Sequence, residues 1–189
     1  HKMIEEWRRK AGLPPRFALY VGTNKPHKNL LRLVQAWQLI DERWPAQAGD
    51  LPKLVIAGME DPRYPQARHA AAGLDDPIIF LGVVPEDQMP LLYNAAELFV
   101  FPSLYEGFGL PVLEAMACGA PAACSNRSAL PEVAGAAAAL FDPEDVEEMA
   151  SVIGRLLRDP EERAHRAKLS LERAASFSWD RTAELTLGA

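Results

Sequence analysis

The segment from Glu97 to Asn126, ELFVFPSLYEGFGLPVLEAMACGAPAACSN, constrains the fold of this chain more than any other feature. Its apolar run 98–101 has the length of a buried strand. A glycine-containing turn follows. Pro111 then stands where a helix would begin, because its fixed φ and missing N–H suit the first helical turn. The segment therefore predicts a strand, a turn, a helix over 112–118 that is buried rather than amphipathic, and a second buried strand over 122–124.

The same alternation of apolar runs and helical patterns extends along the whole chain. The remaining strands are expected at 17–21, 53–57, 78–81 and 137–141. The remaining helices are expected at 3–10, 30–39, 63–72, 85–95, 130–134, 143–158, 160–175 and from 177 onward. Strands that alternate with helices predict an α/β fold, a Rossmann-like doubly wound parallel sheet, and the length favours one domain over 1–189. Ligands of such sheets bind at the carboxyl ends of the strands.

The turn before the helix at 112–118 has the properties of an anion site. A helix N-terminus has unpaired N–H groups and a partial positive charge, so phosphate or sugar oxygens bind well there. Glu106 precedes the turn and Glu114 lies one turn into the helix. A buried carboxylate requires donors, which sugar hydroxyls or a cation would supply to Glu114. The alternative is a structural salt bridge from Glu114 to Arg127 or Lys28.

A second candidate phosphate site follows the strand at 17–21. The sequence there, GTNKPHKN, places two lysines in a loop before a helix that Asn29 is expected to cap. The loop is not a Walker A motif, because the G-x4-GK[ST] spacing is absent. The alternative for Lys28 is an ordinary solvated surface lysine.

Composition excludes several classes of function. A net charge of −6 gives no overall electrostatic reason to expect a nucleic acid or an anionic membrane as partner. Cys118 and Cys124 have apolar neighbours and no CxxC spacing, so they are expected to be small core residues, and we see no metal-ligand pattern. No apolar run has transmembrane length. The chain begins inside an amphipathic helical pattern, so we expect it to be a piece of a longer protein.

Several ordered motifs carry a resemblance to a known family. They are the E-x7-E element EGFGLPVLE at 106–114, together with YVGT at 20–23, PHKN at 26–29, CSN at 124–126, LPEV at 130–133 and FSW at 177–179. Together they resemble the C-terminal, donor-binding half of retaining GT-B glycosyltransferases of the GT4 family. The resemblance implies a nucleotide-sugar binding domain over 1–189 and an N-terminal acceptor domain that this chain lacks.

The resemblance also implies roles for individual residues. Glu114 would bind the ribose hydroxyls, Glu106 the transferred sugar, and Lys28 the donor diphosphate. The catalytic residues would thus be Glu106 and Lys28. Further substrate contacts would come from Gly22, Thr23, Val83, Phe108, Gly109 and Leu110. Thr23 stands where relatives have an arginine, so Lys25 or His27 would have to supply the second positive charge. Val83 has an equally good alternative as a core residue. No metal and no cofactor is implied.

The implied reaction is transfer of a hexose from a nucleoside diphosphate sugar to a glycan or a lipid-linked acceptor. The YVGT and PxKN motifs are similar to those of bacterial mannosyl- and rhamnosyl-type transferases, which favours GDP-mannose, with UDP- and dTDP-sugars open. We expect a cytoplasmic protein with any membrane association through the missing half. The chain by itself is expected to bind donor weakly and to transfer nothing.

Other functions remain open at this point. A dinucleotide-dependent oxidoreductase fits poorly, because Val112 occupies the third glycine position of the fingerprint and no acidic residue ends the next strand. A GT-B sugar-nucleotide epimerase, a phosphorylase or a non-catalytic nucleotide-binding domain would use the same pocket.

Overall fold

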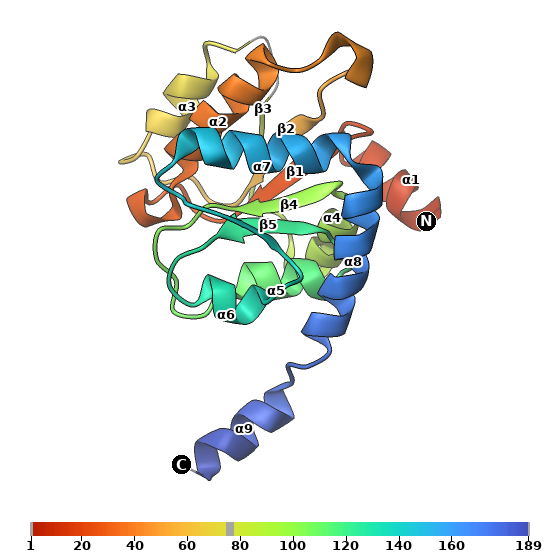
Figure 1. The fold of residues 1–189 in the computed structure, drawn as a ribbon, viewed down its shortest axis with the longest axis vertical. Helices are drawn as coiled ribbons and strands as arrows, with labels where there is room; N and C mark the ends of the chain where they lie inside the picture. Colours follow the sequence, from red (N-terminus) through yellow and green to blue (C-terminus); the bar gives the residue numbers. More distant parts are fainter. Residues whose placement is uncertain (1, 75–77, 189) are drawn as a thin grey trace.

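A six-stranded sheet forms the centre of the computed structural model, which describes residues 2–74 and 78–188 (Figure 1). All paired strands run parallel, in the order β3-β2-β1-β4-β5-β6. The strands are β1 (Phe17–Val21), β2 (Lys53–Ala57), β3 (Ile78–Gly82), β4 (Leu98–Phe101), β5 (Ala122–Ser125) and β6 (Ala139–Phe141). The direction of winding reverses between β1 and β4, which confirms the predicted doubly wound, Rossmann-like sheet.

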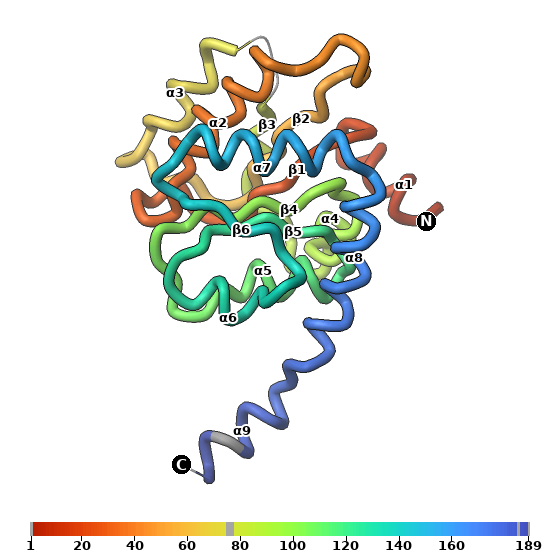
Figure 2. The backbone as a smooth tube through the Cα atoms, viewed as in Figure 1, coloured from red at the N-terminus to blue at the C-terminus, as the bar shows by residue number. Residues whose placement is uncertain are grey.

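Helices cover both faces of the sheet. On one face α2 packs against α3 and α7, and on the other α5 packs against α4, α6 and α8 (Figures 1 and 2). Their bounds are α1 (Lys2–Lys10), α2 (Leu30–Glu42), α3 (Gln66–Ala71), α4 (Met89–Ala95), α5 (Leu110–Ala117), α6 (Leu130–Ala134), α7 (Val146–Arg158), α8 (Pro160–Ala174) and α9 (Trp179–Leu187). Three 3₁₀ turns lie at Pro26–Lys28, Ala46–Ala48 and Glu86–Gln88 in the part of the chain described.

The core is built from central strands that are buried on both faces. Every residue of β4 and β5 is buried, which explains why 98–101 and 122–124 are continuous apolar runs rather than alternating ones. Phe99 and Phe101 of β4 have ring centroids 5.9 Å apart, and Phe99 meets Tyr93 of α4 edge to face at 5.5 Å. From the other face, α2 contributes Trp37, which is fully buried. Packing on both faces fixes β4 and therefore the loop that follows it.

Two predicted helix starts prove to be too early. Helix α3 begins at Gln66 rather than Arg63, because Pro65 disfavours helical φ and ψ for the residue before it. Helix α7 begins after Asp145, whose carboxylate accepts a hydrogen bond from Glu148 N at 2.9 Å. Pro143 is thus outside that helix. Boundaries at helix starts depend on which of several polar side chains reaches the free N–H groups, and the sequence offers more than one candidate.

The last strand and the fourth helix are also shorter than predicted. Strand β6 starts at Ala139 rather than Ala137, because the Ala137 amide turns back to the carbonyl of Ala134 at 3.1 Å. In the segment predicted as one helix from Pro85, residues 86–88 form a 3₁₀ turn and α4 begins at Met89.

Helix α5 contradicts the prediction that it is buried rather than amphipathic. Val112, Ala115 and Met116 are buried, but Leu110 is 46% exposed and Glu114 is exposed too. One stripe of α5 faces the sheet and the opposite stripe faces outward. Apolar residues on an outward stripe left no periodic signal to separate the two faces.

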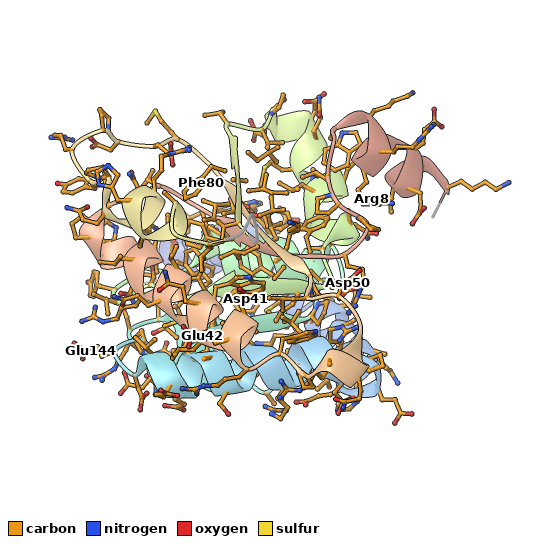
Figure 3. All side chains as sticks on the ribbon, turned by 90° about the horizontal axis from the view of Figure 1, so that it is seen from above. Arg8, Asp41, Glu42, Asp50, Phe80 and Glu144 are labelled. Atoms are coloured by element: carbon orange, nitrogen blue, oxygen red, sulfur yellow. The ribbon has the colours of Figure 1, made fainter. Side chains whose placement is uncertain are left out.

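The loops after the strands and the loops before them lie at opposite edges of the molecule. Figure 3 shows Glu144, which follows β6, at one edge, and Asp50, which precedes β2, at the other. The carboxyl edge holds the segments after β1, β4 and β5, which include the loop GTNKPHKN and the turn after Glu106 that the sequence predicts to be functional.

Helix α9 leaves the body of the molecule after α8 (Figures 1 and 2). Its first residue, Trp179, is 79% exposed. Within residues 2–74 and 78–188, no helix is long and apolar enough to cross a bilayer.

The two thiols should differ in reactivity because they differ in burial. Burial raises the pKa of Cys124 to about 12, and burial together with the nearby Glu114 carboxylate raises the pKa of Cys118. A raised pKa means less thiolate at a given pH, about one part in ten thousand for Cys124 at pH 8. We expect a disulfide reagent at pH 8 to modify Cys118 slowly and Cys124 only after unfolding, with a Cys118→Ser chain isolating the second thiol. Fast modification of both in the native chain would contradict this burial.

Candidate functional site

Two loops at the carboxyl edge are joined by backbone and side-chain hydrogen bonds. The Leu104 amide donates to the carbonyl of His27 at 2.8 Å. The buried Asn29 side chain donates to the carbonyls of Pro102 and Pro143, at 3.0 and 2.7 Å. The sequence predicted that the Asn29 side chain would cap α2, and this prediction is wrong. The side chain instead holds the loop after β1 against the loops after β4 and β6.

This connection brings Lys28 and Glu106 together from positions 78 residues apart. Lys28 Nζ lies 2.6 Å from Glu106 Oε1, and the two side chains are only 18% and 13% exposed. Lys28 Nζ also lies 5.3 Å from the centre of the Phe101 ring. The alternative of a solvated surface lysine is wrong. Because the ammonium has three N–H donors, the pair leaves donors on Lys28 for a ligand.

Glu114 takes a partner that the sequence analysis missed. The Tyr93 hydroxyl of α4 donates to Glu114 Oε2 at 2.8 Å. Burial, and then the neighbouring carboxylate, raise the pKa of Tyr93, so the phenol remains a donor. The signal was present: Tyr93 lies in the core-facing part of an amphipathic segment, where a buried phenol hydroxyl requires an acceptor.

Neither of the salt bridges considered for Glu114 forms. Lys28 pairs with Glu106, and Arg127 pairs with Asp142 at 3.0 Å and Glu144 at 3.5 Å. Glu114 is exposed on the outward stripe of α5, so its carboxylate does not need a cation to compensate burial.

The turn between Glu106 and α5 presents backbone donors. Gly109 has φ 96°, a conformation that L-residues with side chains avoid, and it is the N-cap of α5. The amides of Phe108, Gly109 and Leu110 have no acceptor among the residues described. Three N–H groups without an acceptor, at a helix N-terminus that follows the lysine-bound Glu106 in the chain, suit a phosphate.

The strand ends on the other side of β1 come very close to one another. The Gly22 amide donates to Ala57 O at 2.9 Å, and the Gly58 amide donates to Gly82 O at 2.8 Å. A Cβ built on Gly58 would lie 2.1 Å from the carbonyl oxygen of Gly22. Gly22, Gly58 and Gly82, at the ends of β1, β2 and β3, thus form a row of backbone without side chains, which we call the glycine row.

Thr23 and Val83 directly follow the first and last residues of the glycine row, Gly22 and Gly82. Thr23 Oγ1 is buried without a hydrogen-bond partner, while its carbonyl accepts from the Tyr20 hydroxyl at 2.7 Å. Val83 is 72% exposed, so its alternative reading as a core residue is wrong. β3 lies two strand spacings from β1, about 10 Å, which is the scale of a nucleoside rather than of a phosphate alone.

Two grooves lie on the surface of this part of the molecule. One, of about 280 Å³, is bordered by the outward stripe of α5, including Glu114, and by Phe177 and Trp179; Phe108 and Phe177 meet there edge to face at 5.9 Å. The other, of about 500 Å³, runs between the loop after β1, α2 and the residues before α3. Its lining includes Lys25 but neither Lys28 nor Glu106.

In the described part of the chain, no three His, Cys, Asp or Glu side chains gather into a set that could hold a metal ion.

The chain matches known proteins over most of its length. The model of the family "Glycosyl transferases group 1" matches residues 3–171. The chain is 41% identical to the O-antigen chain mannosyltransferase B of Escherichia coli over 178 residues, covering 92% of this chain and 45% of that protein. It is 37% identical to the D-inositol 3-phosphate glycosyltransferase of Salinispora tropica, covering 93% of this chain and 38% of that protein.

Solved structures show the same fold. Sucrose-phosphate synthase from Thermosynechococcus elongatus aligns with a TM-score of 0.78 at 28% identity, covering 97% of this chain and 47% of that one. Anabaena HepE, solved in complex with UDP and glucose, aligns with a TM-score of 0.84 at 22% identity, covering 100% and 53%. The chain therefore matches the Rossmann-like half of a GT-B fold. It spans less than half the length of the two curated relatives named above. On the family match and the identity to its relatives, this chain belongs to the group 1 family of glycosyl transferases.

Proposed function

We propose that this chain is the donor-binding half of a retaining glycosyltransferase that transfers a hexose from a nucleoside diphosphate sugar. The observation that carries the proposal is the Lys28–Glu106 pair at the carboxyl edge of the sheet, together with the amides of 108–110, which follow Glu106 in the chain and have no acceptor among the residues described. The pair offers a cation for phosphate and a carboxylate for sugar hydroxyls. Glu114, farther along α5, offers a second carboxylate for ribose.

The chemical role of Lys28 follows from charge. When the bond between the anomeric carbon and the β-phosphate oxygen breaks, the electron pair stays on the departing nucleoside diphosphate. An ammonium ion and helix N–H groups fixed beside that oxygen stabilise the developing charge without reorganisation. Gly22 and Thr23 lie at the end of β1, and Val83 lies where a base extending across the strand ends would reach.

Mannose is the favoured hexose and GDP-mannose the favoured donor. Relatives named as mannosyltransferases support this choice, including the serotype-specific mannosyltransferase WbdA of Escherichia coli at 38% identity. The UDP in the HepE structure keeps a uridine donor as the competing possibility.

The acceptor site is proposed to lie on a separate N-terminal domain. The share of the relatives' length that the chain spans supports this division. The exposed Trp179 on α9 is then a residue that such a domain would cover. We further propose that the whole protein acts in the cytoplasm, with any contact to the inner face of the membrane made by the other half.

The test is a thermal-shift panel with GDP, UDP, ADP and dTDP. One nucleotide, expected to be GDP, should stabilise the chain; at 100 times its dissociation constant the gain is about 2.7 kcal/mol. Glu114→Ala should remove most of that shift, because the ribose loses its carboxylate, whereas Glu172→Ala on the outer part of α8 should not. A chain that none of the four nucleotides stabilises would contradict the proposed function, and a preference for UDP would replace the guanosine assignment.

A further inference from the structure

The side chain of Ser103 contacts the carboxylate of Glu106, the proposed sugar-binding group. Ser103 follows the end of β4 by two residues and is fully buried. Its hydroxyl donates to Glu106 Oε1 at 2.5 Å. Ser103 lies in the loop directly after β4, a strand that is buried on both faces, and its own burial restrains the hydroxyl.

Both donors to Glu106 use the same carboxylate oxygen. Lys28 Nζ lies 2.6 Å from Oε1, the oxygen that Ser103 also contacts. No residue within 2–74 and 78–188 donates to Oε2. A carboxylate accepts at about four lone-pair positions, so two donors on Oε1 orient the group and leave Oε2 able to accept from a ligand.

The backbone of Glu106 is fixed as well. The Ser128 hydroxyl donates to Glu106 O at 2.6 Å, and the Glu106 amide donates to the same hydroxyl at 3.3 Å. The loop after β5 thus holds the main chain, while Ser103 and Lys28 hold the side chain. Precise orientation of a binding group requires restraint at both ends.

We infer that Ser103 is a positioning residue for the donor sugar: its hydroxyl holds Glu106 so that Oε2 receives a sugar hydroxyl. The inference rests on the proposed function. Lys28 alone would hold Glu106 less firmly once the donor is bound, because a diphosphate would share the ammonium group. Ser103 keeps the carboxylate in place while Lys28 also donates to phosphate.

Comparing the affinity for a sugar nucleotide with the affinity for the nucleotide alone tests this role. Calorimetric titrations with GDP and GDP-mannose, and with UDP and UDP-glucose, give the ratio of sugar-nucleotide to nucleotide dissociation constants for whichever pair binds. Ser103→Ala should raise that ratio about 10-fold, the scale of a hydrogen bond to a charged group, and leave nucleotide affinity within about twofold. Ser170→Ala is the matched control: Ser170 is also fully buried, but its hydroxyl has no partner.

A double-mutant cycle separates positioning from general damage. In a Glu106→Ala background, Ser103→Ala should have no further effect on the ratio, because the group that it positions is gone. Effects that add in the cycle would overturn the inference. If Ser103→Ala also weakens nucleotide binding, Ser103→Thr retains the hydroxyl donor and should restore both affinities; a threonine chain as weak as the alanine chain would also overturn it.

A ligand-free measurement distinguishes this inference from the proposed function. In ¹³C NMR spectra of the chain, the Glu106 carboxyl signal should shift in Ser103→Ala and stay in place in Ser170→Ala. A signal unchanged by Ser103→Ala contradicts the positioning role even if nucleotides bind. A native chain that binds no nucleotide contradicts the proposed function even if the signal shifts.

Discussion

Replacing Lys28 with methionine is expected to weaken binding of the preferred nucleoside diphosphate about 30-fold or more. A hydrogen bond between charged groups contributes about 1.5–3 kcal/mol, which corresponds to about 10- to 150-fold in affinity. The loss should lie at the upper part of this range, because Glu106 would keep its charge without its cation and would repel the diphosphate. Methionine is an unbranched, uncharged side chain that can fill the space beside Phe101, so the change removes mainly the ammonium group. Titration calorimetry at fixed ionic strength measures the change.

Lys10→Met is the control for the charge itself. Lys10 is an exposed residue at the end of α1 that pairs with Glu6 at 2.8 Å, so its substitution changes the net charge equally. It should leave affinity unchanged. Equal affinities in the Lys28→Met and native chains would remove the diphosphate contact from the proposed site, whereas equal losses in both lysine variants would indicate only long-range electrostatics.

Replacing Gly58 with alanine is expected to destabilise the chain by about 3 kcal/mol or more and to abolish most nucleotide binding. The added Cβ would lie 2.1 Å from the Gly22 carbonyl oxygen, a backbone atom that moves only if β1 and β2 separate at their ends. Gly58 also has φ 132°, which side-chain-bearing residues adopt at a cost of about 1–3 kcal/mol. For a chain of this length the melting temperature should fall about 6–12 °C.

Gly82→Ala distinguishes this close approach from backbone strain alone. Gly82 lies at the end of the neighbouring strand and has φ 77°, but a Cβ there would meet no atom within 4 Å. It should cost about 1–2 kcal/mol, the usual penalty for a left-handed residue. If thermal unfolding gave the same loss for both variants, the contact between the ends of β1 and β2 would not be as tight as described.

The sequence predicted the sheet well because parallel strands that are buried on both faces have continuous apolar sequences. Leu98–Phe101 and residues 122–124 are apolar at every position, and each is followed by a polar residue or a proline. The sequence therefore predicted correctly which segments are strands, and that the loops after β1 and β4 lie at the carboxyl edge of the sheet. The starts of helices were predicted less accurately. Asp142 and Asp145 are equally good caps by residue type, but Asp142 pairs with Arg127 and Asp145 caps α7.

The partners of the site residues were beyond the reach of the sequence. Local pattern cannot specify that Lys28 pairs with Glu106, that Tyr93 donates to Glu114, or that Ser103 and Lys28 share one oxygen. Each contact joins different elements, and its geometry depends on strand order and on the register of loops. The exposed stripe of α5 was missed for the same reason, since an apolar residue on an exposed surface resembles one in the core.

The sequence by itself determined the fold class, the family motifs and the residue types that a nucleotide-sugar site requires, because these depend on local order along the chain. Only the tertiary structure decided which charges meet. Winding outward from β1 in both directions places the loops after β1, β4 and β5 side by side, and close packing then fixes Lys28, Ser103 and Glu106 within hydrogen-bonding distance.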